Sequence, residues 1–258
     1  MSEFYVGYAP KMPTALRGFV QRVVIGVGLL AMTIAVVLLS GQMPFAQSTF
    51  EFGHSRVFEG MLETEPYPTL LVDRPGDVPS ESRYSRYLLV APGKHGADTL
   101  LDGMNGKRVR LQGELIYRGE QTMIEIEPAS IQLLANADPG PAEFHSLGEA
   151  DVTGEIVDSK CYLGVMNPGM GKVHRDCASR CISGGIPPIF VTARGDQFLL
   201  LDPGGKPFER DGLREFVAEP ISLRGELLER GDSRFLKISL KDLHHTLTTK
   251  ISESPRQR

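Results

Sequence analysis

The chain has 258 residues, a formal net charge of −4 and a sequence pI near 5.9. Its lysines and arginines are not gathered on one face with interleaved aromatic residues, which argues against nucleic acid as a partner. All three cysteines lie between Cys161 and Cys181. An odd number of cysteines cannot all be paired within one chain, so at least one sulfur needs a role other than an internal disulfide.

An uncharged apolar segment begins at Val23, and no charged residue follows it until Glu51. At about 1.5 Å per residue the segment is long enough to cross a hydrocarbon core of roughly 30 Å. We therefore expect a transmembrane helix over residues 23–45. A cleaved signal peptide is the alternative; the length of the apolar run, and Pro44 and Phe45 near the possible cleavage site, argue against it.

The basic residues near this segment predict its orientation. Lys11, Arg17 and Arg22 precede the segment, whereas the first basic residue after it is Arg56. Because positive charge stays on the cytoplasmic side, residues 1–22 should be cytoplasmic and the rest of the chain should be exported. We predict a single-pass inner-membrane protein whose C-terminal part is periplasmic, a compartment in which disulfides persist.

The exported part contains an internal repeat. The segment Val109–Glu120 recurs at Ile221–Asp232 with a constant offset (221 − 109 = 112). Each copy alternates apolar and polar residues on both sides of an Arg-Gly turn, which predicts a β-hairpin with one buried face. Further matches upstream, copy one before copy two, are strands at 58–62 and 152–156, strands at 87–90 and 198–201, and short helical stretches at 97–102 and 212–217.

This order of elements predicts a mainly β fold, with an N-terminal transmembrane helix followed by two tandem OB-like small β-barrels. Each barrel should have five strands and a short helix between the third and fourth; a generic small β-barrel is the alternative. The expected regions are a cytoplasmic N-terminus (1–22), the transmembrane helix (23–45), the first barrel (51–135), a linker (136–149), the second barrel (150–248) and a flexible tail (249–258).

The second copy carries an insertion that the first lacks, and it holds Cys161, His174, Cys177 and Cys181. Steps of three and four residues place the last three on one face of a helix, and a flexible loop can fold Cys161 back onto that face. Three thiolates and one imidazole form a tetrahedral set suited to zinc or copper. We therefore predict a Cys3His metal site, grafted onto a barrel that does not need it.

Neighbouring residues bear on this site in several ways. Met166 and Met170 would favour Cu⁺ if their thioethers bind the metal, or they fill gaps in the packing. Asp158 and Asp176 are candidates to orient His174. A disulfide from Cys161 to Cys177 or Cys181, with one spare thiol, remains an alternative in an oxidising compartment, as does redox chemistry by the three thiols.

The insertion reads D-x-x-C-Y from Asp158, H-x-x-C-A-x-x-C from His174, and G-I-P at its end. In these motifs it resembles a group of exported bacterial proteins without an assigned activity. The resemblance covers only this segment. It implies a bacterial, extracytoplasmic protein and implies no reaction.

The sequence contains no phosphate-binding loop, serine elbow or H-E-x-x-H motif, which favours a binding role over catalysis. We predict a membrane-anchored accessory protein with a zinc or copper site, for metal handling or for assembly of a membrane redox complex. Its partner should be a membrane or periplasmic protein. The alternatives are a thiol/disulfide redox protein using Cys161, Cys177 and Cys181, and an interaction module stapled by a disulfide.

Overall fold

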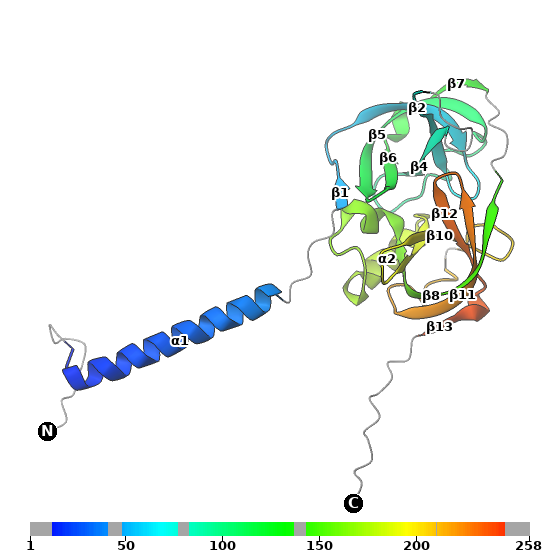
Figure 1. The fold of residues 1–258 in the computed structure, drawn as a ribbon. Coiled ribbons are helices and arrows are strands. Elements are labelled where there is room, and N and C mark those ends of the chain that lie inside the picture. The colour runs from blue at the N-terminus through cyan, green and yellow to red at the C-terminus, as the bar shows by residue number, and fades with distance from the viewer. Residues whose placement is uncertain (1–11, 41–47, 77–82, 137–142, 210, 246–258) are drawn as a thin grey trace, which may run out of the picture. The chain divides into compact units, whose positions relative to one another are not determined.

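The structure is a computed structural model that describes residues 12–40, 48–76, 83–136, 143–209 and 211–245. It consists of an N-terminal unit, which contains one long helix, and a compact unit from Ala46 to Arg258 (Figure 1).

The helix α1 spans Thr14–Ser40. From Leu16 to Ser40 it is long and apolar enough to cross a membrane, with a mean hydropathy of 2.7. The predicted apolar N-terminal helix is therefore confirmed, and it is consistent with a membrane anchor or with a signal sequence. It begins earlier than residue 23, and residues 41–45 of the predicted span lie outside the described residues.

The first barrel is a closed ring of five strands with two further strands attached. Its strands are β1 (Ser48–Phe50), β2 (Arg56–Glu63), β3 (Thr69–Asp73), β4 (Tyr84–Val90), β5 (Lys107–Arg118), β6 (Gln121–Ile126) and β7 (Gln132–Asn136). Around the ring the order is β2, β3, β4, β6, β5 and back to β2, and only the β4–β6 pair is parallel. Strands β1 and β7 pair with β5, and a 3-10 turn, η2 (Pro128–Ser130), precedes β7.

The second barrel repeats this ring. Its strands are β8 (His145–Asp158), β9 (Pro188–Thr192), β10 (Gln197–Leu201), β11 (Ile221–Arg230), β12 (Ser233–Lys237) and β13 (Leu243–His245), with the 3-10 turn η5 (Leu240–Asp242) before β13. The ring order is β8, β9, β10, β12, β11 and back to β8, again with one parallel pair, β10–β12. The single strand β8 corresponds to both β1 and β2 of the first barrel. Its first half pairs with the end of β11, just as β1 pairs with the end of β5.

The strand register confirms the repeat. Gly60 of β2 lies opposite Val109, and Gly154 of β8 lies opposite Ile221, which reproduces the offset seen in the sequence (221 − 109 = 112). A Cβ atom on Gly60 would lie 2.4 Å from the carbonyl oxygen of Leu71, and one on Gly154 would lie 2.0 Å from that of Val191. Both glycines are therefore required where the opening strand bends closely past its neighbour.

The two short helices predicted at 97–102 and 212–217 are wrong: both stretches form turns. In the first barrel, the Leu101 amide donates to the carbonyls of Ala97 and Asp98, and the chain then reverses at Gly103 with φ 69°. Nucleating a helix fixes the conformation of several residues for a single hydrogen bond. A stretch this short therefore gains little free energy by forming a helix. Leu101 is fully buried in the core of the first barrel, so the turn still contributes an apolar side chain to the packing.

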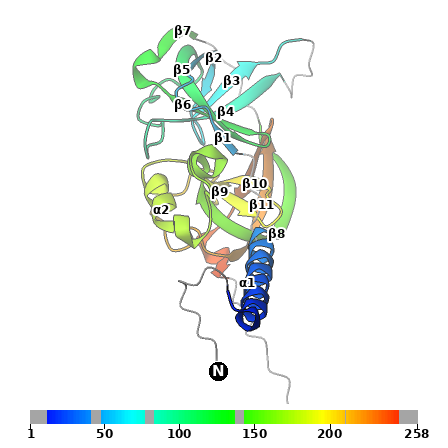
Figure 2. The same cartoon turned by 90° about the vertical axis from the view of Figure 1, so that its left-hand side faces the viewer.

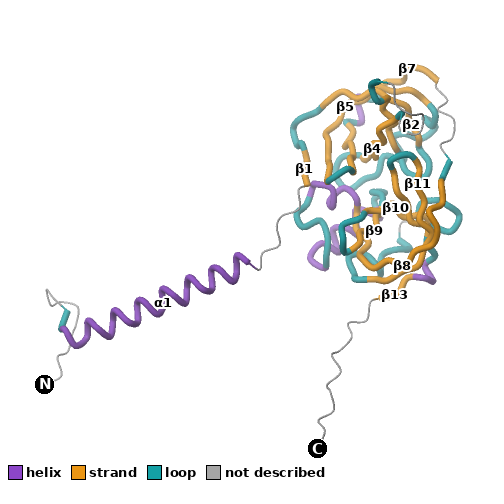
Figure 3. Tube along the Cα trace, viewed as in Figure 1, coloured by secondary structure: helices purple, strands orange, loops and turns teal. Residues whose placement is uncertain are grey.

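The insertion of the second barrel lies between β8 and β9. It contains one turn of π-helix, η3 (Cys161–Val165), a 3-10 turn, η4 (Lys172–His174), and the α-helix α2 (Arg175–Ser183), which are among the purple helical segments of the compact unit in Figure 3. Helix α2 ends before Gly184 because Gly185 takes a φ of 99° and Pro187 follows.

The two barrels pack against each other through a shared core (Figure 2). Ile116 and Met123 of the first barrel belong to the same buried cluster as Val157 and Leu199 of the second. The Tyr67 hydroxyl crosses the boundary to donate a hydrogen bond of 2.5 Å to the Leu200 carbonyl. The insertion is part of this interface, since η3 lies against β1 and β5 of the first barrel.

Candidate metal centre

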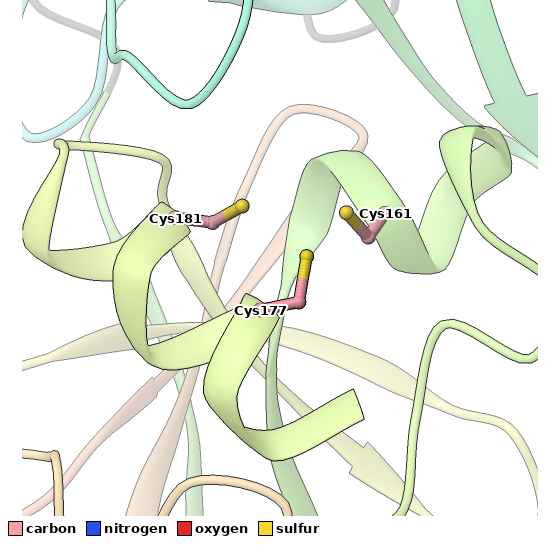
Figure 4. A group of neighbouring side chains, drawn as sticks. All are labelled: Cys161, Cys177 and Cys181. Atoms are coloured by element: carbon pink, nitrogen blue, oxygen red, sulfur yellow. The ribbon is translucent and has the colours of Figure 1, made fainter. Parts of the chain in front are cut away.

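Three cysteine side chains converge at the insertion. The Sγ atoms of Cys161, Cys177 and Cys181 lie within 4.8 Å of one another, and Figure 4 shows the three side chains pointing toward a common space. Cys161 and Cys181 are buried, whereas Cys177 is partly exposed. All three are free thiols in the structure.

Local structure explains this convergence. Cys177 and Cys181 are one turn apart on α2, so their side chains leave the helix on the same face. Cys161 begins η3, and its amide donates a 2.8 Å hydrogen bond to Oδ1 of Asp158 at the end of β8. The following loop returns closely over it, since a Cβ atom on Gly169 would lie 2.6 Å from the Cys161 carbonyl oxygen. The first cysteine is thus held by the barrel strand and the other two by the helix.

His174 belongs to a second, overlapping group. Ligand atoms of Asp158, Cys161 and His174 also lie within 4.8 Å of one another, and all three residues are buried. His174 Nε2 lies 2.9 Å from Asp158 Oδ2. The four residues expected to bind metal are therefore arranged as two groups that share Cys161, with His174 beside the three-sulfur group.

The structure selects Asp158 as the partner that orients His174. Asp158 is fully buried and contacts both the histidine ring and the Cys161 amide. Asp176, the other candidate, is exposed, and no hydrogen bond joins it to His174 within the described part of the chain. A buried carboxylate held between a histidine and a backbone amide is a typical support for a metal-binding histidine.

Sequence reasoning missed Lys94, which reaches the cysteines from the first barrel. Its ammonium group donates to Cys177 Sγ at 2.7 Å and to Cys181 Sγ at 3.6 Å. The hydrogen bond with Cys177 raises the pKa of Lys94, against a smaller opposing effect of burial. An ammonium group can only donate hydrogen bonds, and its positive charge contributes to lowering the pKa of Cys181.

A second lysine holds the loop that carries Lys94. The Lys160 side chain is buried, forms an ion pair with Glu125, and donates to the carbonyls of Ala91 at 3.0 Å and Gly93 at 2.7 Å. Lys160 stands directly before Cys161 in the insertion, so the same short segment supplies one sulfur of the cluster and fixes the neighbouring barrel's loop.

Two glycines allow the barrels to meet at this point. The Gly96 amide of the first barrel donates a 3.0 Å hydrogen bond to the Gly184 carbonyl at the end of α2. A Cβ atom on Gly184 would lie 1.8 Å from the Lys94 carbonyl oxygen, and one on Gly96 would lie 2.2 Å from that of Gly185. Only glycine permits this approach, which brings the Lys94 loop against the cysteine-bearing helix.

The protonation of the cysteines follows from these contacts. The hydrogen bond from Cys161, reinforced by the Lys94 charge, lowers the pKa of Cys181 to about 7, although burial opposes the shift. The same hydrogen bond, with burial and the nearby Asp158 carboxylate, raises the pKa of Cys161. Within this hydrogen-bonded pair the proton is therefore favoured on Cys161 and the thiolate on Cys181.

The methionines of the insertion lie at different depths. Met170 is partly buried and packs against the core cluster that contains Cys161 and Cys181, whereas Met166 is 44% exposed. Met170 thus packs against the core that the two barrels share.

Comparison of the chain with protein-family models, with curated proteins and with solved structures finds no match. The chemistry of the site itself therefore has to indicate its role. Three converging sulfurs fit a thiophilic metal ion, and the lowered pKa of Cys181 favours a thiolate, the form that binds a metal.

Proposed function

We propose that this chain is a membrane-anchored, extracytoplasmic accessory protein that binds zinc or copper at Cys161, Cys177 and Cys181. The observation that carries the proposal is the convergence of three sulfur atoms within 4.8 Å of one another. Thiolates are preferred ligands of Zn²⁺ and Cu⁺. The first barrel closes without such residues, so the fold itself does not require them.

For an ion that takes four ligands, we propose His174 as the fourth. Its Nε2 is occupied by the Asp158 carboxylate, which leaves the Nδ1 lone pair available for a metal. A metal-binding histidine commonly uses one ring nitrogen for the ion and the other for a carboxylate. The assigned tautomer follows from this hydrogen bond, with Nε2 as the donor.

We also propose that both barrels are of the OB type. Their ring order and their single parallel pair, between the third and fifth strands, support this assignment. The turns in place of the helix between the third and fourth strands are a departure from the expected pattern. In this assignment the metal site is an elaboration of the connection between the first and second strands.

An accessory role in metal handling, or in assembling a membrane redox complex, fits the position of the site. Cys177 is partly exposed, so a ligand from a membrane or periplasmic partner protein can reach the ion. A purely structural zinc site is normally closed to such exchange. The apolar helix α1 would keep the site at the membrane surface where such a partner resides.

The direct test is metal binding by the full chain in detergent micelles. We expect one equivalent of zinc or copper per chain, measured by elemental mass spectrometry, and loss of binding in Cys177→Ser and Cys181→Ser. Ser179→Ala, a change elsewhere on the same helix, is the matched control and should keep the metal. A folded wild-type protein that binds neither ion would refute the proposal.

Two further measurements separate the alternatives. Alkylation with and without reduction detects a disulfide, whose cysteines become reactive only after reduction; such a result would favour the stapled or redox protein. Asp158→Asn should reduce metal affinity by about 10–100-fold, because losing the carboxylate behind a ligand weakens that ligand. Unchanged affinity in this variant would exclude His174 as the fourth ligand.

A further inference from the structure

We propose that Lys94 biases the three-sulfur site toward a monovalent ion, Cu⁺, over a divalent ion such as Zn²⁺. The inference rests on the proposed metal-binding function and names the class of ion that the same site prefers. It makes Lys94 a specificity-determining residue contributed by the first barrel to a site on the second.

The position of Lys94 is set by contacts on both sides of its loop. Lys160 binds the carbonyls of Ala91 and Gly93, just before Lys94, and Gly96 donates its amide to Gly184, just after it. The close approach at Gly184 leaves no space between the loop and α2. The Lys94 backbone therefore cannot withdraw from the cysteines without separating the two barrels at this point.

The Lys94 ammonium lies against the sulfurs that would bind the ion. Its Nζ is 2.7 Å from Cys177 Sγ and 3.6 Å from Cys181 Sγ, and these two sulfurs lie within 4.8 Å of the third. An ion bound among the sulfurs is therefore within a few ångströms of a fixed positive charge. At that separation the interaction is strong even at the effective dielectric of a protein surface.

This positive charge disfavours a divalent ion more than a monovalent one. The repulsion between Lys94 and the bound ion is proportional to the charge of the ion, so it is twice as large for Zn²⁺ as for Cu⁺. Lys94 also attracts the electron-rich sulfurs, but that contribution is common to both ions because each binds the same three sulfurs. The effect of Lys94 on the ratio of the Cu⁺ and Zn²⁺ affinities therefore reports the difference in charge between the two ions.

The ligand set supports the same preference. Three soft sulfurs converge, while His174 is held beside them by Asp158. Structural zinc sites almost always have four ligands, whereas soft thiolate ligands also select Cu⁺. A site with three sulfurs at hand and an ammonium group beside them suits the monovalent ion better.

The test compares the affinities of the full chain, in detergent micelles without oxygen, for the two ions. Cu⁺ affinity is measured by competition with bicinchoninate, and Zn²⁺ affinity by competition with a chromophoric zinc chelator. In Lys94→Gln, we expect the ratio of the two affinities to move toward Zn²⁺ by about tenfold or more, allowing for solvent screening of this mostly exposed lysine. Lys94→Leu removes the same charge without introducing a metal ligand and provides a second variant should the first not fold.

Two control variants separate charge from side-chain loss. Lys94→Arg keeps the charge and should retain the wild-type ratio, and Lys206→Met removes an exposed lysine from a loop of the second barrel and should also retain it. If the neutral Lys94 variants bind both ions with the wild-type ratio, the inference is overturned while the proposed metal site stands. If the wild-type chain binds neither ion, the proposed function itself fails.

Discussion

Replacing Gly184 by alanine tests the contact that joins the cysteine-bearing helix to the first barrel. The backbone of Gly184 is right-handed, with φ −78° and ψ −5°, so alanine introduces no strain of its own there. Its Cβ atom would nevertheless lie 1.8 Å from the Lys94 carbonyl oxygen. Restoring ordinary contact at 3.4 Å requires a local separation of about 1.6 Å (3.4 − 1.8 = 1.6) between the two backbones.

The cost of that separation can be worked out from its parts. Overpacking costs about 1–3 kcal/mol. Loss of the hydrogen bond from Gly96 to Gly184 adds about 0.5–1.5 kcal/mol, for a total of roughly 2–4 kcal/mol. For a unit of this size each kcal/mol shifts the Tm by about 2–4 °C, so we expect Tm to fall by roughly 5–15 °C.

Differential scanning fluorimetry of the full chain in micelles measures this change. Gly212→Ala is the matched control, since its Cβ atom would have its nearest neighbour at 3.3 Å and its φ is not in the left-handed region. Its Tm should stay within a few degrees of wild type. A Gly184→Ala protein as stable as wild type would show that the barrels do not meet as described, and would remove the structural basis for the position of Lys94.

Two other predictions concern the charges buried in the compact unit. Glu63→Gln should lower the free energy of unfolding by about 3–5 kcal/mol, because it leaves the buried guanidinium groups of Arg86 and Arg230 without their carboxylate. Urea denaturation measures this change. As a control, Glu149→Gln breaks the exposed pair with Arg224 and should cost less than about 1 kcal/mol. The pKa of Cys181, lowered from 9.0 to about 7, favours the folded thiolate, so the stability it contributes is fully present above pH 9 and is lost as the pH falls through about 7. Thiolate absorbance should accordingly rise near pH 7 in the metal-free wild type but not in Cys181→Ser, and a first thiolate that appears only near pH 9 would contradict the proton sharing between Cys161 and Cys181.

Much of the fold was predictable because it is encoded in local patterns. The alternation in the two hairpins, their Arg-Gly turns and the constant offset between the copies identified two β-barrels, and the register of Gly60 and Gly154 confirms that alignment. The helices predicted at 97–102 and 212–217 form turns instead. Stretches this short gain too few helical hydrogen bonds to offset nucleation, so the apolar pattern alone does not decide between helix and turn.

The candidate site was predictable in part for a similar reason. Cys177 and Cys181 share a helix face through their spacing alone, and Cys161 had to be nearby if the loop folded back. His174 pairs with Asp158, rather than with Asp176, because the fold places the end of η4 beside the end of β8. No spacing rule distinguishes those two carboxylates.

The amino-acid sequence by itself determined the apolar N-terminal helix, the duplicated barrels and the gathering of three cysteines in one insertion, because periodicity and short spacings act between neighbours along the chain. The tertiary structure alone decided that Lys94 meets Cys177, residues 83 positions apart, and that Lys160 and two glycines hold them together. That contact exists only where two barrels pack, and the packing is the sum of many distant contacts that no local pattern records.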